Sequence, residues 1–393
     1  MKNKFILAIE TSCDETAMSL VRFVENKNGW EIDILSNVVA SQIDIHKKWG
    51  GVYPELASRA HLEAMIPVLE EALEPLNELR ITNNELRMGL ESIHNSPFKI
   101  LDSISAVAVT QGPGLIGSLL MGIETAQVIS AIYNKPIVPV NHLEGHVYSA
   151  FAEYKGKGQR VKVKNSKFEI PKRGIFPVLS LVVSGGHTSL ILMEDHLKYK
   201  TVGQTIDDAA GEAFDKVARI LDLGYPGGPA IEKLAKTGNE NVYDLPVALK
   251  NSLDFSFSGL KTAALYLTKD PRTQKKLKYN RADLAASFQK AVVDALILKT
   301  QKAISKYNPK TVILSGGVSA NGYLRERFVR QLSARRAEPS GRRPQPPVIL
   351  IPPVALSTDN AVGIAIASAL KFSKNQTIPW KDIDALPNFP IDF

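Results

Sequence analysis

The stretch FILAIETSCDETAMSLVRFV (residues 5–24) contains two apolar segments separated by a short polar turn. This pattern predicts a buried β-strand, a tight turn and a second strand. The stretch VLSLVVSGGHTSLILM (178–193) has the same pattern about half a chain later. The two stretches therefore indicate an internal repeat, with one strand-hairpin in each half of the chain.

The segments that follow each hairpin also correspond. Residues 106–140 have the pattern of a strand, a glycine turn, a long amphipathic helix and another strand. Residues 311–332 and 346–353 have the same order of elements, with a basic insertion before the last strand. Two copies of this unit predict a duplicated α/β fold with a cleft between the halves.

The remaining segments divide into helices and insertions. Helical periodicity, with apolar residues three and four positions apart, marks four segments: 54–73, 207–229, 281–307 and 357–372. Three segments lack this periodicity and are expected to be loops or insertions: 77–100, 154–173 and 334–347.

The composition is typical of a globular protein with a sizeable core, since 44% of the 393 residues are hydrophobic and 22% are charged. The single cysteine, Cys13, excludes an intrachain disulfide and is expected to be a small buried residue. No apolar run approaches the roughly 20 residues of a membrane span, and the N-terminus lacks the features of a signal peptide. We expect a cytoplasmic protein that crosses no membrane.

The net charge of +8 is concentrated in three segments, 154–173, 268–281 and 330–344. Such segments are often only solvated loops. Lysine and arginine also supply the sequence-independent part of nucleic-acid affinity. The charge pattern therefore leaves both a plain surface and a polyanion-binding surface open.

Three glycine turns follow apolar strands, at 112–114, 184–186 and 315–317. Glycine lacks a Cβ, so its backbone N–H groups can approach a phosphate closely, and a following helix adds a favourable dipole. One such turn is weak evidence, whereas three turns placed on the repeat favour a nucleotide site.

The turn of the first hairpin, ETSCDET (10–16), contains Glu10, Asp14 and Glu15. A turn rich in these residue types is usually only a turn. Because a fully apolar strand precedes it, the acids are expected at the carboxyl end of that strand, where they could orient a phosphate or a metal-bound water.

His142 and His146 are four residues apart, directly after Asn141, a residue type that caps helices. Side chains four apart on a helix share a face, which suits two imidazoles on one metal ion. Glu144 points roughly opposite, so it cannot act as the general base of a zinc peptidase. Asp359 is the candidate third ligand, although an N-cap role is equally open.

Asp215 precedes a glycine-rich turn, and Gly228 and Glu232 follow it. A carboxylate can accept hydrogen bonds from two sugar hydroxyls. An ordinary solvated helix acid explains Asp215 equally well if this segment is taken alone.

Nine motifs together resemble one family. They are AIETSCDETA, GGVYPELASRAHLE, VTQGPGLIGSLLMG, NHLEGH, VVSGGHTSL, IDDAAGEAFDKVARILDLGYPGGPAIEKLA, FSFSGLKTA, SGGVSANGYLRE and STDNA. In this order, over nearly the whole chain, they are similar to the bacterial branch of the TsaD family, the tRNA threonylcarbamoyladenosine transferases once labelled glycoproteases.

The resemblance implies the actin-like and sugar-kinase-like ATPase (ASKHA) fold, with two lobes around a nucleotide cleft. The expected lobes are 1–140 and 141–359, the latter with basic insertions 154–173 and 334–347, and residues 360–393 are expected to pack back on the first lobe. The implied reaction moves a threonylcarbamoyl group from threonylcarbamoyl-AMP to N6 of the adenosine just 3′ of the anticodon, adenosine 37. The tRNAs concerned read codons that begin with adenine.

The resemblance also implies the site residues. His142, His146 and Asp359 become ligands of one divalent metal ion, iron in many members, although zinc also suits this donor set. Asp14 and Glu15 would lie near the phosphate end of a bound adenylate or ATP. The residues implied to hold that nucleotide are Val182, Val183, Ser184, Gly185, Gly186, Asp215, Gly228, Glu232 and Asn321.

Family members usually act on tRNA together with a paralogous TsaB-type subunit and a TsaE-type small ATPase, so we expect these partners and no membrane. No general base is evident, and His187 is only a weak candidate. A small-molecule kinase of the same fold would explain the repeat and the glycine turns but neither the histidine pair nor the basic segments. The orientation of Glu144 argues against a metallopeptidase, and the intact set of acids and histidines argues against a non-catalytic scaffold.

Overall fold

The computed structural model describes residues 3–82, 97–153, 166–333 and 346–392. By its internal contacts the chain divides into two compact units, each described here by itself. The first unit contains Met1–Ile45, Val52–Gly174 and Asp359–Ile391. The second contains His46–Gly51, Ile175–Thr358 and Asp392–Phe393.

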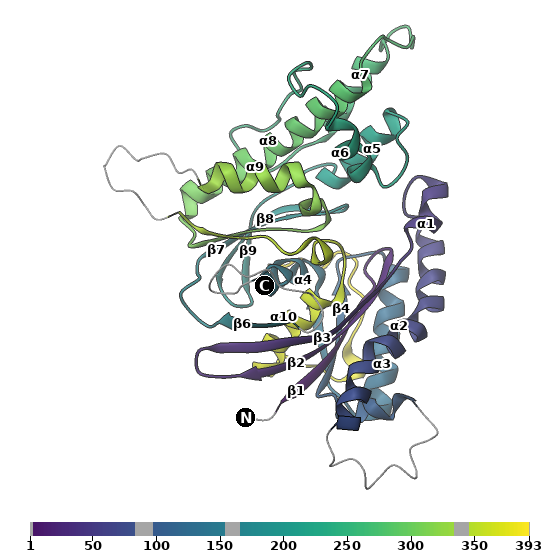
Figure 1. The fold of residues 1–393 in the computed structure, drawn as a ribbon, viewed down its shortest axis with the longest axis vertical. Coiled ribbons are helices and arrows are strands. Elements are labelled where there is room, and N and C mark those ends of the chain that lie inside the picture. Colours follow the sequence, from purple (N-terminus) through teal and green to yellow (C-terminus); the bar gives the residue numbers. More distant parts are fainter. Residues whose placement is uncertain (1–2, 83–96, 154–165, 334–345, 393) are drawn as a thin grey trace, which may run out of the picture. The chain divides into compact units, whose positions relative to one another are not determined.

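The first unit contains a six-stranded sheet with the strand order β5-β4-β1-β2-β3-β6 (Figure 1). Strands β1, β2 and β3 form an antiparallel meander, β4 and β5 run parallel to β1, and β6 pairs antiparallel with β3. The bounds are β1 Lys4–Glu10, β2 Glu15–Glu25, β3 Gly29–Ser41, β4 Ala106–Gly112, β5 Ile137–Asn141 and β6 Ser166–Pro171.

The second unit contains a five-stranded sheet with the order β11-β10-β7-β8-β9. Strands β7, β8 and β9 again form an antiparallel meander, while β10 and β11 run parallel to β7. The five strands match β5-β4-β1-β2-β3 in order and direction, which confirms the predicted duplicated α/β fold. The bounds are β7 Val178–Val183, β8 Thr188–Asp195, β9 Lys198–Gln204, β10 Thr311–Ser315 and β11 Val348–Leu350.

Ten α-helices lie among the described residues. Their bounds are α1 Ile43–His46, α2 Pro54–Thr82, α3 Ile116–Tyr133, α4 His142–Ser149, α5 Ala210–Ile220, α6 Gly227–Ala235, α7 Ser258–Thr268, α8 Arg281–Tyr307, α9 Gly322–Ser333 and α10 Ala361–Ser373. Helices α2 and α3 pack together and against the sheet of the first unit, and α10 also packs against that sheet.

Strand β1 is apolar from Phe5 to Ile9, as expected of a strand with both faces buried. Leu7 and Ile9 belong to the apolar cluster formed with α2 and α3. Ile6 and Ala8 alternate with them and are also fully buried, and α10 contacts this strand. Glu10, the polar carboxyl end of the strand, therefore lies at the edge of a core that covers both faces of β1, and it is itself buried.

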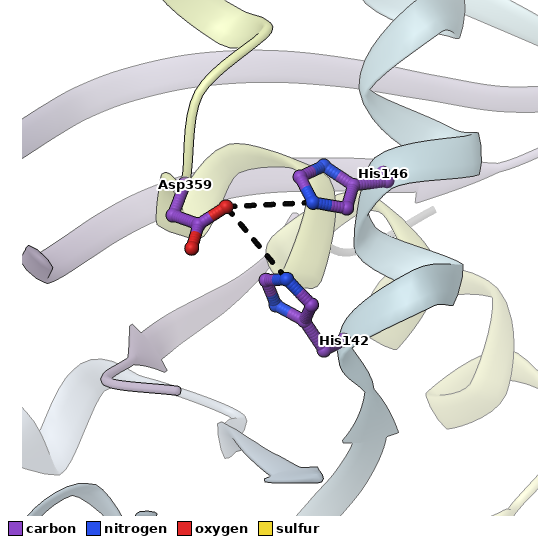
Figure 2. A group of neighbouring side chains, drawn as sticks. All are labelled: His142, His146 and Asp359. Carbon is purple, nitrogen blue, oxygen red and sulfur yellow. Dashed lines mark ion pairs between the residues drawn. The ribbon is translucent and has the colours of Figure 1, made fainter. Parts of the chain in front are cut away.

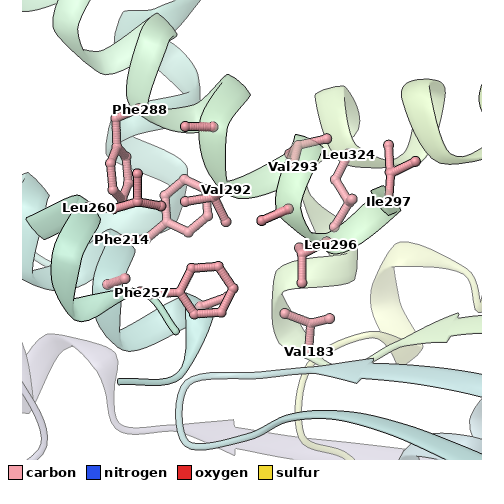
Figure 3. Packing of buried hydrophobic residues seen from close by; sticks show 14 of the residues in the cluster. Val183, Phe214, Phe257, Leu260, Phe288, Val292, Val293, Leu296, Ile297 and Leu324 are labelled. Carbon is pink, nitrogen blue, oxygen red and sulfur yellow. The ribbon is translucent and has the colours of Figure 1, made fainter. Parts of the chain in front are cut away.

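The core of the second unit joins the face of its sheet to helices α5–α9 (Figure 3). Phe214 on α5 and Phe288 on α8 meet edge to face, with their ring centroids 5.3 Å apart. Val183, the last residue of β7, packs into the same cluster. This packing fixes the end of β7, from which the glycine turn at 184–186 begins.

Helix α3 alone among the described helices has the length and hydropathy of a membrane span, although the sequence analysis predicts none. The helix packs against β4 and α2, and 39% of it is buried inside the first unit. The core helix of a soluble protein passes the same test, so its apolar character is weak evidence for a membrane span.

Three predicted helices differ from the structure in their bounds. The segment 207–229 is predicted to be a helix that ends in a glycine turn. The structure has α5 ending at Ile220 and α6 beginning at Gly227, because Asp222 and Gly224 adopt positive φ angles of 51° and 82° and interrupt the helical backbone. Helix α10 begins at Ala361 rather than at 357, since Asn360 caps it. The helix predicted at 54–73 extends to Thr82, and the one predicted at 281–307 is confirmed.

The predicted insertions lie largely outside the described residues, which exclude 83–96, 154–165 and 334–345. The segment 154–173 is not entirely a loop, because β6 pairs with β3. This pairing, together with the packing of α4 on α10, groups residues 141–174 with the first unit, whereas the sequence placed a boundary at 140. Helix α10 and the segment up to Ile391 also belong to the first unit.

Candidate metal centre and nucleotide site

Helix α4 begins with a complete capping box. The Oδ1 atom of Asn141 accepts a hydrogen bond from the Leu143 N–H at 2.8 Å, and the Glu144 carboxylate accepts one from the Asn141 N–H at 3.0 Å. The same carboxylate forms an ion pair with Lys371 at 2.7 Å. Asn141 is thus the predicted cap, and Glu144 is engaged in structure rather than in peptidase chemistry.

The cap aims His142 and His146 toward Asp359 (Figure 2). The Asp359 Oδ1 atom lies 3.7 Å from His142 Nε2 and 3.4 Å from His146 Nε2. One candidate ligand atom from each residue lies within 4.8 Å of the other two. The N-cap alternative for Asp359 is wrong, because Asn360 accepts the hydrogen bond from the Val362 N–H.

The donor set fits a metal ion. His142 and His146 are buried, and the buried Nε2 atom of His146 has no hydrogen-bond partner among the described residues. A buried polar atom without a partner is costly, and a metal ion would satisfy it. Two imidazole nitrogens and one carboxylate suit iron, zinc or manganese.

Glu10 supplies the charge beside His142. Its Oε2 atom lies 3.0 Å from His142 Nδ1. Burial lowers the pKa of His142, but the Glu10 and Asp359 carboxylates raise it more, to about 9. Burial raises the pKa of Glu10, yet His142 and Ser12 hold it below its usual value. A metal ion on His142 would therefore displace a proton.

The predicted acidic turn lies in the same unit. Burial raises the pKa of Glu15 well above its usual value, and the nearby Asp359 and Asp14 carboxylates raise it further. Burial and Asp14 also raise the pKa of Cys13, so its thiol stays protonated and unreactive. The raised pKa shows that the acidic groups around Asp359 repel one another, and a cation bound beside them would relieve this repulsion.

Two residues that hold this turn, His61 and Ser118, were not predicted from the sequence. The fully buried His61 on α2 contacts the Thr16 hydroxyl at 2.8 Å and the Cys13 carbonyl at 3.0 Å. The Ser118 hydroxyl on α3 donates to the same carbonyl at 2.9 Å. Two helices therefore hold the acidic turn in place, although no spacing in the sequence links them to it.

In the second unit, the glycine turns at 184–186 and 315–317 lie at the ends of neighbouring parallel strands, with Val182 opposite Ser315. A Cβ at Gly185, Gly186 or Gly317 would meet nothing within 4 Å. The space beside Gly185, Gly186 and Gly317 is therefore open, whereas Ser315 and Gly316 are buried. A phosphate site at the first of these turns stays a prediction.

The other predicted nucleotide residues are linked by hydrogen bonds between helix ends. The Asp215 carboxylate accepts from the Gly227 N–H at 2.7 Å, at the start of α6. Glu232 on α6 accepts from the Gly322 N–H at 3.1 Å, at the start of α9. Asn321 accepts from the Leu324 N–H, and its amide donates to Gln289. Gly228 has open space where a Cβ would stand.

A cavity of ≈ 400 Å³ adjoins these helix ends. Of the predicted nucleotide residues, only Glu232 lines it, next to Gly322 and Tyr323. His187, the weak candidate for a general base, closes the β7–β8 turn, where its N–H contacts the Ser184 hydroxyl at 3.1 Å. That contact is made by the backbone of His187 and assigns no role to its imidazole.

A family model described as TsaD, tRNA N6-adenosine threonylcarbamoyltransferase, matches residues 33–87 and 98–366. The chain belongs to the TsaD family. A Dehalococcoides mccartyi transferase of that name is 45% identical over 383 residues, covering 97% of this chain and 98% of the relative. The Bacillus subtilis transferase is 42% identical, covering 95% and 92%.

Among solved structures, HypF from T. kodakarensis aligns with a TM-score of 0.54 at 12% identity, covering 97% of this chain and 49% of HypF. Full-length HypF in its phosphate- and nucleotide-bound form aligns with a TM-score of 0.52 at 13% identity, covering 94% and 55%. These similarities concern the fold alone, and they agree with the predicted ASKHA class. The family membership confirms the resemblance and does not favour the kinase alternative.

Proposed function

We propose that this chain transfers the threonylcarbamoyl group of threonylcarbamoyl-AMP to N6 of adenosine 37 in tRNAs that read codons beginning with adenine. The observation that carries the proposal is the family match over nearly the whole chain. The convergence of His142, His146 and Asp359 supports it from the structure. We further propose that the reaction takes place in the cytoplasm.

The proposed reaction is an acyl transfer. The adenine N6 attacks the carbamoyl carbonyl carbon, the bond from that carbon to the phosphate oxygen breaks, and AMP leaves with the electron pair while N6 loses a proton. The mixed anhydride is already activated, so catalysis consists mainly of positioning and charge stabilisation. We assign no side chain to the role of general base.

His142, His146 and Asp359 would hold one divalent metal ion, with iron the first candidate and zinc the second. The ion would supply Lewis acidity and charge neutralisation. The chain contributes the orientation of the three ligands, since the capping box of α4 and the Asn360 cap of α10 fix the helices that carry them.

The adenylate, or ATP in its place, would lie on the second unit. The accessible turn at 184–186 suits the phosphate, and Asp215, Gly228, Glu232 and Asn321 suit the nucleoside. Asp14 and Glu15 are proposed to act at the phosphate end of the nucleotide. A cation bound with that phosphate would offset the repulsion between the phosphate and these acidic side chains.

A basic arm formed by residues 269–281 is proposed to contact tRNA. Residues 271–278 are exposed. An isolated antiparallel β-bridge between the backbones of Lys269 and Lys276 holds the two ends of this arm together. None of the ion pairs found among the described residues uses Arg272, Lys275 or the other cations from 269 to 278. Unpaired, exposed cations are suited to phosphate contacts. The other two basic segments fall largely outside the described residues.

We also propose a TsaB-type partner subunit and a TsaE-type ATPase. Helices α2 and α3, which pack together, expose large apolar side chains that a partner helix could cover: Leu62, Ile66, Ile116 and Leu120. Exposed apolar side chains on neighbouring helices are typical of protein interfaces.

The test of the proposal is nucleoside analysis of unmodified tRNA after incubation with the protein and preformed threonylcarbamoyl-AMP, with and without bacterial partner proteins. We expect threonylcarbamoyladenosine with the intact protein and at least a hundredfold less with His142→Ala. No product under any partner condition, with nucleotide still bound, would favour the kinase or scaffold alternatives. Retention of a transition metal through gel filtration separates the transferase from a kinase, which needs only exchangeable magnesium.

A further inference from the structure

We infer that Glu10 is the positioning residue of the metal centre: it holds the His142 ring so that Nε2 faces Asp359 and His146. The inference rests on the proposed metal site and adds to it a residue outside the three ligands. The decisive observation is that the two nitrogens of the His142 ring face different carboxylates. Nδ1 of His142 lies 3.0 Å from Glu10 Oε2, while Nε2 lies 3.7 Å from Asp359 Oδ1.

Hydrogen-bond chemistry fixes which nitrogen carries the proton. Nδ1 of His142 also lies 3.1 Å from the Ser12 hydroxyl, which can donate or accept a hydrogen bond. The Glu10 carboxylate accepts from the Ser12 N–H and the Thr110 hydroxyl and is an acceptor toward the ring as well, so Nδ1 is the donor. A metal ion would displace the Nε2 proton of the charged ring and leave a neutral imidazole with its proton on Nδ1 and its lone pair on Nε2. That lone pair is directed toward the other two ligands, which is the state a metal ion requires.

Glu10 is itself held in place from both carboxylate oxygens. The Ser12 N–H donates to Oε1 at 2.6 Å, and the Thr110 hydroxyl donates to Oε2 at 2.7 Å. Only 1% of the residue is exposed. Glu10 ends β1 and Thr110 lies in β4, two paired strands, so the sheet fixes the carboxylate and the carboxylate fixes the ring.

A purely structural ion pair between β1 and α4 is the competing explanation. The two explanations differ in what the variants do to metal affinity. Loss of a carboxylate beyond a histidine ligand typically weakens metal binding 10- to 100-fold. A structural pair would instead change the unfolding transition of the metal-free protein and leave the metal affinity of the folded fraction unchanged.

The experiment titrates the metal-free full-length protein with Zn²⁺ against a competing chelator. We expect Glu10→Gln, which keeps an acceptor but loses the charge, to raise the Kd about 10-fold, and Glu10→Ala about 100-fold. Thr110→Val keeps the side-chain size and should raise it a few-fold. Asp33→Asn removes a carboxylate paired with Arg22 on β2 and serves as the control, with an unchanged Kd.

The second readout is the ring proton of His142 in the ¹⁵N-labelled, Zn²⁺-loaded protein. We expect a slowly exchanging Nδ1–H signal in the wild type and in Asp33→Asn, and its loss in Glu10→Ala. Wild-type Zn²⁺ affinity in folded Glu10→Ala would overturn the inference, as would a proton on Nε2. If that variant does not fold, unchanged affinity in Thr110→Val overturns it.

His142→Ala separates this inference from the proposed metal site. If His142→Ala binds Zn²⁺ as the wild type does, the metal site is wrong and the role of Glu10 falls with it. If His142→Ala abolishes binding while the Glu10 variants bind normally, only the positioning role is wrong. Weakened binding in both sets supports the site and the role together.

Discussion

Asn141 connects α4, the helix with two of the candidate metal ligands, to the C-terminal segment, and its replacement should destabilise the first unit. Its Oδ1 atom caps α4 by accepting from the Leu143 N–H. Its Nδ2 atom donates to the carbonyls of Phe389 and Pro390, at 3.0 and 3.2 Å. Only 1% of the residue is exposed, so water cannot replace these partners.

The expected cost of Asn141→Ala follows from the hydrogen bonds that the variant cannot form. An N-cap contributes about 1 kcal/mol, and each of the two hydrogen bonds to the segment contributes a similar amount. We therefore expect the free energy of unfolding to fall by about 2–4 kcal/mol. Asn141→Ser keeps a capping oxygen but loses both hydrogen bonds to the C-terminal segment, so about two-thirds of that loss should remain.

Urea denaturation of the metal-free protein, followed by circular dichroism, measures these free energies. The exposed Asn241 offers a matched control, and Asn241→Ala should change the free energy by less than about 0.5 kcal/mol. A decrease below about 0.5 kcal/mol in Asn141→Ala would refute the reasoning. Equal decreases in the serine and alanine variants would also refute it, because the cap would then contribute nothing.

Three further predictions concern packing and pH. A Cβ at Gly363 would stand 2.0 Å from the Gly145 carbonyl oxygen, so Gly363→Ala should push α10 away from α4. We expect the free energy of unfolding to fall by about 1–3 kcal/mol. Zn²⁺ binding should weaken as well, which the chelator titration measures. Phe214→Ala should cost about 3–5 kcal/mol in urea, and a decrease under about 1 kcal/mol would contradict its core position. Burial raises the pKa of Asp207, but hydrogen bonds from Ser256 and Ser258 lower it more, to a net value below 3.8. The stabilisation by ionised Asp207 is therefore present above about pH 4 and is lost as the pH falls toward the folded pKa. The stability of Asp207→Asn should fall less steeply between about pH 4 and lower pH than that of the wild type. The same steepness in both proteins would contradict this prediction.

The fold brings the candidate metal ligands together through two helix caps rather than through one motif. His142 and His146 follow the Asn141 cap on α4, while Asp359 directly precedes the Asn360 cap on α10. Gly145 and Gly363 let the two helices approach closely at this point. The distance between Asp359 and the histidines therefore depends on helix packing, which makes the site sensitive to substitutions that touch no ligand.

Local patterns in the sequence were enough to predict the repeat, the alternation of strands and helices, and the histidine pair. Continuous apolar runs mark the buried strands, and a spacing of four on a capped helix puts His142 and His146 on one face. The nine family motifs are local as well. For this reason the fold class and the family could be predicted from the amino-acid sequence.

The combinations of distant residues depend on tertiary packing and could not be predicted in this way. Glu10 and His142 are 132 positions apart and meet only because β1 ends beside the start of α4. The sequence allows Asp359 to be either a metal ligand or a helix cap, and only the structure shows that Asn360 is the cap. Likewise, β6 joins the first sheet by pairing with β3, a contact over more than 130 positions that no local pattern encodes. The pKa values of these residues depend on burial and on neighbouring charges, and both come from neighbours that the order of the chain does not reveal.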